Sequence, residues 1–563
     1  MDISLGKLKN LLVGPGHISE QDFKDAVEEA KTTKKDLQVV IVEKNLLKDA
    51  QLGRLVAEEL GFPFIDLKKE KVDNTTLRLI PELVAKSKGV IAVARKKDGV
   101  KVGMIHPNDL ETQHLLEKRI GEPIIPHFIT KRGLEVALAL YRASLSDEFH
   151  SIVEQLRNTE LPREQRNQAA KSMVDTLLLY GYQSKASDIH IEPYVKKIMV
   201  RFRIDGVMHD VLEIPKELAD LILIRLKILA RLRTDEHRAA QDGKLRFDAK
   251  SEVIDIRISI APVTQGENIV MRLLSAQNRQ LNLGDLGLIG KNLTKVKRAI
   301  KKPYGMILVT GPTGSGKTTT LYAIIKILNK REIHIATIED PVEYDIEGIS
   351  QIQVNTQTNL TFAKGLRALV RQDPDIIMVG EIRDEETAGI AVNSAMTGHL
   401  VLSTIHANDS ATTLPRLLDM KIEPFLVAST INVVVAQRLV RKVCERCRVS
   451  YQLGDEEKRL MDNEPAIQQF FKVRGSGKIQ KVYLYKGKGC KVCGNTGYDG
   501  RTGIFEVLEM TEDIKKMILK RSSSDEIMAV AQRSGMTTML EDGLEKALNG
   551  ITTLEEVLRV TKM

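Results

Sequence analysis

The distribution of apolar and polar positions changes along the chain, and each change predicts a different kind of structure. Over residues 1–66, apolar residues recur at helical spacing in two copies offset by 29 positions, as at Leu8 and Leu37. Each copy predicts a helix, a turn and a second helix, and Gly61-Phe62-Pro63 ends the second copy. This region is predicted to be a helical repeat, a pattern that simple helix packing explains equally well.

Shorter runs with strand-like alternation follow in residues 67–145. The segment 90–105 predicts a hairpin that turns at Asp98-Gly99, with helices after it. Together with the repeat, this small α/β unit makes residues 1–145 a predicted N-terminal domain. Residues 146–168 are polar, and we expect them to hold a linker.

Residues 169–288 are predicted to form a second α/β domain, with a helix, alternating strands and a further long helix. Arg257 and Arg272 each lie among β-branched residues on two of these strands. Taken alone, each is typical of an exposed arginine on an edge strand. Residues 276–290 are rich in Gly and Asn and predict a hinge into the next domain.

The apolar run Met306–Val309 predicts a buried strand, and residues 321–328 have helical spacing. The loop between them fits the P-loop motif G-x-x-x-x-G-K-[ST], in which backbone N–H groups and a helix N-terminus hold phosphates. We expect Lys317 to reach the β and γ phosphates of ATP and Thr318 to ligate Mg²⁺. The predicted ATP-binding residues are Gly311, Pro312, Thr313, Gly314, Ser315, Gly316, Lys317, Thr318 and Thr319.

Three later apolar runs each end in an acidic or imidazole side chain. Glu339 ends the first and is followed by Glu343, Glu381 ends the second, and His406 ends the third. Open α/β sheets bind ligands at the carboxyl ends of their strands. Glu339 and Glu381 are therefore candidates to hold the metal and activate water, and His406 to sense the γ-phosphate.

All four cysteines lie in Cys-x-x-Cys pairs, a spacing typical of a structural zinc site with four protein ligands. The site would hold together an insertion at about residues 440–500. The ATPase domain that contains this insertion is predicted over residues 289–563, and its C-terminal tail is predicted to consist of capped helices. The predicted zinc ligands are Cys444, Cys447, Cys490 and Cys493.

Composition fits a multidomain globular chain: 563 residues, 42% hydrophobic and 28% charged. No run of 18 apolar residues and no secretory signal is visible, so we expect a cytoplasmic protein. The net charge of +9 favours a diffuse solvated surface, and with 4% aromatic residues a base-stacking nucleic-acid platform is not expected.

In this order, the motifs resemble the type II/IV secretion ATPases, the GspE/PilB family. The resemblance is strong over residues 165–563, and the length and layout most resemble the pilus-extension members, with type II secretion members close behind. Besides the P-loop, it rests on Ser187–Pro193, Asp255–Ser259, Gln265–Leu274, Ile338–Glu343, Arg371–Asp384, Thr397–Asn408 and Ala436-Gln437-Arg438-Leu439.

The resemblance implies a RecA-like ATPase domain preceded by a PAS-like domain, assembled as a homohexamer on the cytoplasmic face of the inner membrane. Its partners would be an inner-membrane platform protein and, through it, the pilin assembly machinery. It also implies that Arg257 and Arg272 contact phosphate and that Glu339, Glu343, Glu381 and His406 belong to the catalytic site, with Mg²⁺ at Thr318 and Glu381.

The N-terminal repeat resembles the family's cyclic-di-GMP-binding module (MshEN), whose copies begin Arg-Leu-Gly. Here they begin Lys7-Leu8-Lys9 and Asp36-Leu37-Gln38. Both lack the glycine, and Asp36 places a negative charge where a phosphate would lie, so we expect no tight binding. Two other functions remain open at this point: a type II secretion ATPase and, in another class, a nucleic-acid translocase.

Overall fold

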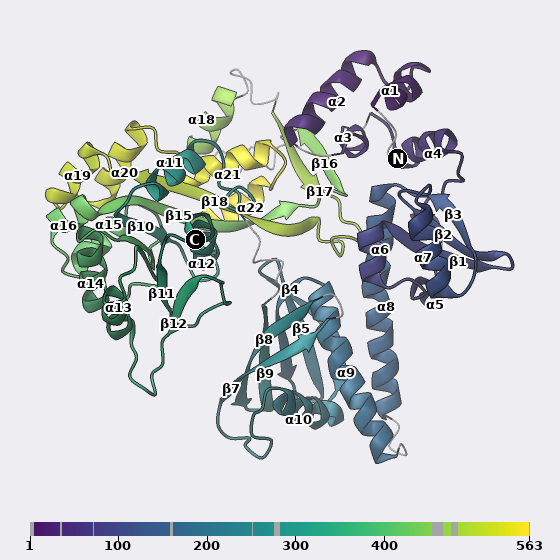
Figure 1. Ribbon diagram of the computed structural model, residues 1–563, viewed down its shortest axis with the longest axis horizontal. Coiled ribbons are helices and arrows are strands. Elements are labelled where there is room, and N and C mark those ends of the chain that lie inside the picture. Colours follow the sequence, from purple (N-terminus) through teal and green to yellow (C-terminus); the bar gives the residue numbers. More distant parts are fainter. Residues whose placement is uncertain are drawn as a thin grey trace. The chain divides into compact units, whose positions relative to one another are not determined.

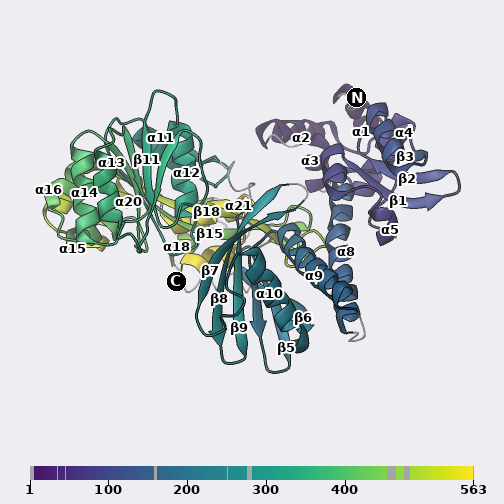
Figure 2. The ribbon, with the colours of Figure 1, turned by 60° about the horizontal axis from the view of Figure 1, so that its bottom comes forward.

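The computed structural model describes residues 5–33, 36–44, 46–70, 72–157, 162–249, 252–274, 282–452, 465–474 and 482–561. The chain divides into two compact units. One unit comprises residues 1–274 with the short segment 490–495, and the other comprises residues 275–489 and 496–563. Figures 1 and 2 show the elements of both units.

The predicted N-terminal repeat is confirmed as two successive helix pairs. Leu8 and Leu12 of the first pair share a core with Leu52 and Val56 of the second. The last helix ends before Gly61, which takes the left-handed conformation (φ 74°) that glycine adopts without strain. The helices are α1 (Leu5–Val13), α2 (Glu20–Thr33), α3 (Leu37–Glu43) and α4 (Asp49–Leu60).

The predicted hairpin is also confirmed, as the first two strands of a three-stranded sheet. Its strands pair antiparallel, and the third strand runs parallel to the second. The strands are β1 (Val90–Lys96), β2 (Gly99–Met104) and β3 (Ile124–Phe128). The helices around them are α5 (Asn74–Leu77), α6 (Glu82–Lys88) and α7 (Leu110–Ile120).

The segment 146–168, predicted to hold a linker, is helical in most of its described residues. Helix α8 runs from Lys131 to Arg157, and α9 runs from Arg163 to Gln183. Tyr141 of α8 is buried in the core of the small sheet, whereas Phe149 is buried in the core of the next sheet. Although this segment is polar in composition, its apolar residues recur at the spacing of a helix. The residues with this spacing are Phe149, Ile152, Val153 and Leu156.

The second domain is built on a six-stranded antiparallel sheet of order β6-β5-β4-β9-β8-β7, with α9 and α10 beside it (Figure 1). Alternate residues of β8 from Ile254 to Ile260 are buried in one core, so Arg257 lies on the opposite face. The elements are β4 (Ala186–Pro193), β5 (Lys197–Ile204), β6 (Val207–Pro215), η1 (Lys216–Leu218), α10 (Ala219–Leu229), β7 (Gln241–Asp248), β8 (Val253–Val263) and β9 (Gly266–Leu274). Residues 276–281 of the predicted hinge at 276–290 lie outside the described residues.

The other unit contains a seven-stranded sheet of order β12-β11-β13-β14-β10-β15-β18, parallel except for β18. Side chains of β10 alternate between two cores, and α13 and α14 lie on one side of the sheet and α11 and α12 on the other (Figure 2). The strands are β10 (Gly305–Thr310), β11 (Ile335–Glu339), β12 (Ile349–Gln353), β13 (Ile376–Val379), β14 (Leu400–Ile405), β15 (Ile431–Val443) and β18 (Tyr498–Glu509). The helices are α11 (Gly290–Ile300), α12 (Lys317–Leu328), α13 (Phe362–Val370), α14 (Glu385–Met396), α15 (Thr413–Asp419) and α16 (Pro424–Thr430).

An insertion follows β15, and its apolar residues pack on the C-terminal helices, as Phe471 does with Leu544 and Leu558. Thr511 caps α19 and Ser523 caps α20, in agreement with the capped helices predicted for the C-terminal tail. The elements are β16 (Arg448–Gln452), α18 (Pro465–Arg474), β17 (Tyr483–Gly487), α19 (Glu512–Leu519), α20 (Ser524–Arg533), α21 (Met539–Leu548) and α22 (Leu554–Thr561).

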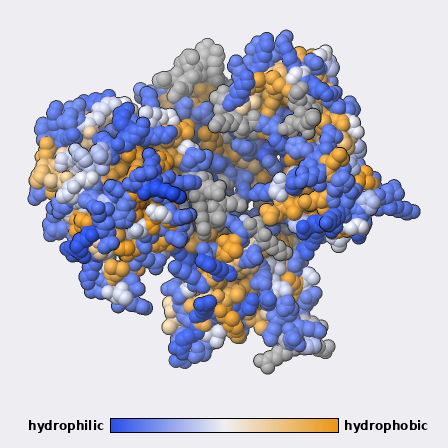
Figure 3. All heavy atoms as spheres, in the orientation of Figure 1, coloured by the Kyte–Doolittle hydropathy of each residue, from blue (hydrophilic) through white to orange (hydrophobic). Residues whose placement is uncertain are grey.

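Large apolar side chains are exposed on three neighbouring helices of the same unit. They are Met396 of α14, Phe425 of α16 and Leu519 of α19, each more than half exposed. Helix α16 packs against both α14 and α19, and Figure 3 shows an apolar area near α16. Exposed patches of this kind often mark contacts with other proteins.

Candidate active site

The P-loop follows β10, the strand between β14 and β15 in the sheet, and leads into α12. Gly311 and Gly316 have φ angles of 146° and 88°, which favour glycine. A Cβ at Gly311 would also lie 2.4 Å from the carbonyl oxygen of Gln437 on β15. The loop therefore needs glycine both for its turn and for its close approach to the neighbouring strand.

Lys317 is the first residue of α12 and lies against the loop that it terminates. Its Nζ donates hydrogen bonds to the carbonyl oxygens of Gly311 at 2.9 Å and Pro312 at 3.1 Å. Burial lowers the pKa of this ammonium group, while the negative charge of Glu381 acts in the opposite direction. Lys317 and Glu381 thus belong to one electrostatic site, as their positions in the sequence predicted.

Glu381 and His406, predicted from two separate strand ends, are in contact. His406 Nε2 lies 3.1 Å from Glu381 Oε2, and Arg383 pairs with Oε1 at 2.5 Å. The hydrogen bond with Glu381 raises the pKa of Arg383. The side chain of His406 is 49% exposed and that of Glu381 14%. Both can therefore be reached from solvent beside the phosphate loop.

Hydroxyl side chains fix the strand ends that carry this pair. Thr310 Oγ1, at the end of β10, donates to the carbonyl oxygens of Ile405 and Ala407 on either side of His406. Thr404 Oγ1 donates to the carbonyl oxygen of Gly380, next to Glu381, at 2.8 Å. Both hydroxyl groups are buried. The geometry of the pair is thus set by the sheet rather than by flexible loops.

Glu339 is in a different environment from Glu381, since it is only 2% exposed. Its carboxylate accepts hydrogen bonds from Tyr322 Oη at 2.5 Å, Thr337 Oγ1 at 2.7 Å and Gln351 Nε2 at 3.2 Å. Tyr322 Oη also accepts a hydrogen bond from the backbone N–H of Glu343. Burial, together with the charge of Glu339, raises the pKa of Tyr322. Tyr322, which the sequence did not single out, therefore joins the two predicted glutamates.

Gln437 is a second residue whose role was missed, although its motif was part of the resemblance. It is 2% exposed and lies on β15 beside the P-loop. Its Nε2 donates to the carbonyl oxygen of Ser315 at 2.5 Å, and its Oε1 accepts from Thr320 Oγ1 at 2.6 Å. Gln437 thus joins the phosphate loop to the first turns of α12.

The four cysteines come together as predicted, with their sulfur atoms all within 4.8 Å of one another. Cys490 Sγ and Cys493 Sγ are 3.7 Å apart. Four sulfur atoms at about 2.3 Å from a tetrahedral zinc ion are separated by about 3.8 Å, so the donor set fits zinc. The backbone supports the two turns, since Cys444 N–H donates to Gly497 and Lys488 N–H donates to Cys447.

Arg257 and Arg272 face each other across β8 and β9 of the second domain. Arg272 Nε donates to Asp188 Oδ1 at 3.0 Å, and Arg203 Nε lies 3.6 Å from Asp188 Oδ2. Asp188 is the strand partner of both Arg272 and Arg203, and Lys244 is the partner of Arg257. These five side chains form one row across the sheet. Asp188 lies in a motif of the resemblance, but its role was not predicted.

This fold and this phosphate loop define a P-loop nucleoside triphosphatase. A family model described as "Type II/IV secretion system protein" matches residues 163–559. The chain therefore belongs to this family, as its motifs predicted. A second model, "MshEN domain", matches residues 60–147. That segment holds the small sheet, whereas the sequence resemblance was placed on the helical repeat.

Known proteins resemble the chain over most of its length. It is 38% identical to the type IV pilus assembly ATPase PilB of Myxococcus xanthus, over 98% of each chain. It is 43% identical to the type II secretion system ATPase E of Vibrio cholerae, over 74% of this chain and 80% of that one. The prediction that the chain is an ATPase of this family is confirmed.

The structure resembles that of the Legionella pneumophila ATPase DotB, with a TM-score of 0.51 over 69% of this chain and 95% of that one. At 20% sequence identity, this likeness shows the fold alone. In the part of the chain that the structure describes, no helix is both long and apolar enough to cross a membrane.

Proposed function

We propose that this chain is the motor ATPase of type IV pilus assembly. The observation that carries the proposal is the P-loop site with its Glu381–His406 pair in a chain that matches a pilus assembly ATPase from end to end. The match to the Vibrio cholerae secretion ATPase covers 74% of this chain, which makes type II secretion the second candidate.

The site residues have separate roles in this proposal. Residues 311–319 hold ATP, and Mg²⁺ is held by Thr318 and Glu381. The metal neutralises charge on the β and γ oxygens when it is bound. His406 and Arg383 orient the Glu381 carboxylate, while Tyr322 fixes Glu339 and Glu343. We assign metal holding to Glu381 because the Glu339 carboxylate is buried and accepts three hydrogen bonds, whereas the Glu381 side chain is 14% exposed.

Arg257 and Arg272 would supply positive charge to the γ-phosphate from a different domain, in a homohexamer that closes during turnover. A planar guanidinium group with several donors suits phosphate oxygens. An arginine finger contributes about 10³–10⁵ in rate. The exposed apolar side chains of α14, α16 and α19 suit subunit contacts in such an assembly.

ATPase measurements on size-checked oligomers test this role of the arginines. Arg257→Ala and Arg272→Ala should each lose most of the turnover and change nucleotide affinity far less. Arg246→Ala is the matched control, since Arg246 lies on the same sheet, is 80% exposed and pairs with Asp255. Wild-type turnover in both test variants would refute the role.

The remaining assignments follow from the family. The motor would act on the cytoplasmic face of the inner membrane through a platform protein, and zinc at the four cysteines would be structural. The proposed domains are 1–145, 169–288 and 289–563, with α8 and α9 spanning the segment between the first two. We propose no nucleic-acid partner, and DNA-stimulated hydrolysis with a steep salt dependence would contradict this.

Deletion of the gene in its host separates the two candidate pathways. Loss of surface pili with normal protein secretion, restored by the wild-type gene and not by Glu381→Gln, is the expected result. Loss of secretion with normal pili would instead identify a type II secretion ATPase.

A further inference from the structure

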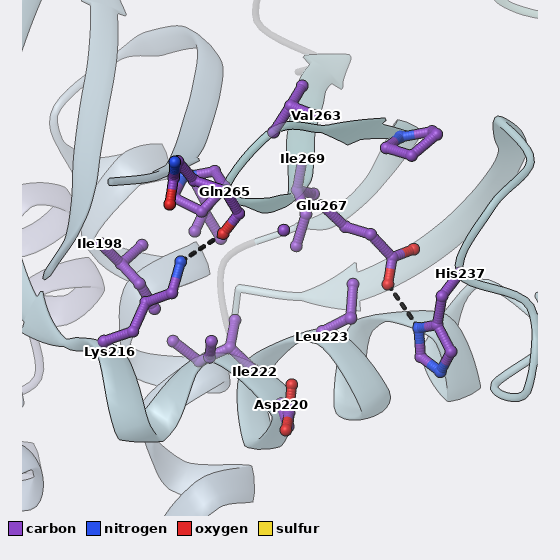
Figure 4. Close-up of a pocket in the computed structure, with 15 residues that line it drawn as sticks. Ile198, Lys216, Asp220, Ile222, Leu223, His237, Val263, Gln265, Glu267 and Ile269 are labelled. Atoms are coloured by element: carbon purple, nitrogen blue, oxygen red, sulfur yellow. Dashed lines mark hydrogen bonds and ion pairs between the residues drawn. The ribbon is translucent and has the colours of Figure 1, made fainter. Parts of the chain in front are cut away.

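A cavity of about 370 Å³ lies at one end of the antiparallel sheet of the second domain (Figure 4). It is lined by the end of β4, the start of β5, the start of α10 and the turn between β8 and β9. We call it the β8–β9 cavity. All of its lining residues lie between positions 191 and 269, so one compact unit forms the whole site.

The floor of the β8–β9 cavity is aliphatic. Its side chains belong to the core of the domain, and each is at most 7% exposed. They are Ile191, Ile198, Ile222, Leu223 and Ile269. Val263, also part of the lining, is 44% exposed. An apolar group that covers the exposed part of Val263 and the remaining exposed surface of the floor would be stabilised here.

One side of the cavity carries a cationic side chain that a hydrogen bond holds in place. Lys216 Nζ donates a hydrogen bond to the backbone carbonyl oxygen of Gln265, in the turn between β8 and β9. Gly266, the next residue of this turn, has a φ of 135°, a conformation that favours glycine. An ammonium group has three donors. The carbonyl group therefore fixes the side chain while leaving donors for an anionic group inside the cavity.

The other side carries a carboxylate that is already neutralised. Glu267 pairs with the fully buried Lys227 at 2.8 Å and with His237 Nδ1 at 2.7 Å. Figure 4 shows Lys216 and the Glu267–His237 pair on opposite sides of the apolar residues. Asp220 also lines the cavity, but it is exposed, so water and salt screen its charge. An anionic head group would therefore lie at Lys216.

We propose that the β8–β9 cavity binds one amphiphile, an unbranched acyl chain with an anionic head group, such as a fatty acid. The aliphatic floor takes the chain, and Lys216 pairs with the head. The volume of about 370 Å³ lies at the small end of the range for ligand pockets, about 300–1,000 Å³. This capacity corresponds to a medium-length chain.

Isothermal titration of the full chain with dodecanoate tests the proposal without using ATP hydrolysis, so its outcome is independent of the proposed function. We expect about one site per chain and an affinity that falls about fourfold for each methylene removed, down to octanoate. Lys216→Gln should weaken binding about tenfold or more, because a charge-assisted hydrogen bond is lost. Ala219→Phe, which fills the cavity from the first turn of α10, should abolish binding.

Lys196→Gln is the matched control, since Lys196 is exposed, belongs to the same domain and does not line the cavity. It should bind dodecanoate as the wild type does. Vesicles containing phosphatidylglycerol, tested on the same variants, distinguish a membrane lipid from a free acid as the source of the chain. Absence of dodecanoate binding, or binding that survives both Lys216→Gln and Ala219→Phe, would overturn the proposal.

Discussion

Replacing Gln437 by Met should weaken nucleotide binding, although Gln437 is not one of the residues proposed to contact ATP and acts on them through Ser315. Methionine keeps the length and roughly the volume of glutamine but has no amide group. The substitution leaves the carbonyl oxygen of Ser315 and the hydroxyl of Thr320 without their partner on β15. Thr320 is 1% exposed and Ser315 is 4% exposed, so water replaces the lost contacts poorly.

The magnitude follows from these two groups. Each buried polar group that loses its hydrogen bond costs about 1–3 kcal/mol, which gives about 2–6 kcal/mol for the pair. Part of this loss appears in the free energy of unfolding, and the rest appears as a P-loop that departs from its binding geometry. If about 2 kcal/mol falls on the loop, the dissociation constant for ATP rises about 30-fold.

The assay is titration with a fluorescent ATP analogue, together with thermal unfolding of the same samples. The variant Thr320→Val and the double variant Thr320→Val/Gln437→Met complete a double-mutant cycle. The effects of the two substitutions on stability should not be additive, because the two side chains share a hydrogen bond. Gln452→Met is the control, since Gln452 is exposed on β16 and should change stability by less than about 0.5 kcal/mol. Unchanged ATP affinity and an unchanged unfolding temperature in Gln437→Met would refute this role of Gln437.

Three further predictions concern other parts of the chain. Burial raises the pKa of Glu556, but hydrogen bonds from Arg559 and Arg441 bring it from 4.5 down to about 2. The Glu556 carboxylate therefore contributes about 3 kcal/mol to the free energy of unfolding above pH 4.5, and this contribution is lost as the pH falls toward 2. In acid unfolding curves, Glu556→Gln should remove this pH dependence of stability. Metal analysis should find about one zinc per chain, with Cys444→Ser lowering solubility more than turnover per folded molecule; metal-free protein purified without chelator would contradict the site. Calorimetry should show no tight cyclic-di-GMP binding, because Asp36 caps α3 and pairs with Lys131; a micromolar or tighter constant would contradict this.

The elements that carry the phosphate site could be predicted because their sequence signals are local. The strand before the P-loop is a continuous apolar run, typical of strands buried on both faces. Glu381 and His406 follow similar runs, and the rule that ligands bind at the carboxyl ends of parallel strands brings them together. The structure places these two side chains 3.1 Å apart.

Side-chain partners across the fold could not be predicted in the same way. Tyr322 and Glu339 are 17 positions apart, and Gln437 and Ser315 are 122 apart. No periodic pattern encodes such pairs, because they depend on how strands are ordered in the sheet. The burial of Glu339 could not be predicted either. The sequence places an acid at the end of a strand, but it does not show whether the carboxylate oxygens already accept hydrogen bonds from neighbouring side chains.

The row of charges on the second sheet supports a role for its arginines that neither residue indicates alone. Arg257 and Arg272 are directly opposite each other, and like charges in this position destabilise a pair of strands. Asp188 offsets part of this effect through Arg272, but Arg203 shares the same carboxylate and Lys244 adds a further positive charge beside Arg257. The row sets four cationic side chains beside the carboxylate of Asp188, an arrangement of donors that suits an incoming anion. In the proposed function this anion is the γ-phosphate of ATP, and its arrival would relieve the repulsion between Arg257 and Arg272.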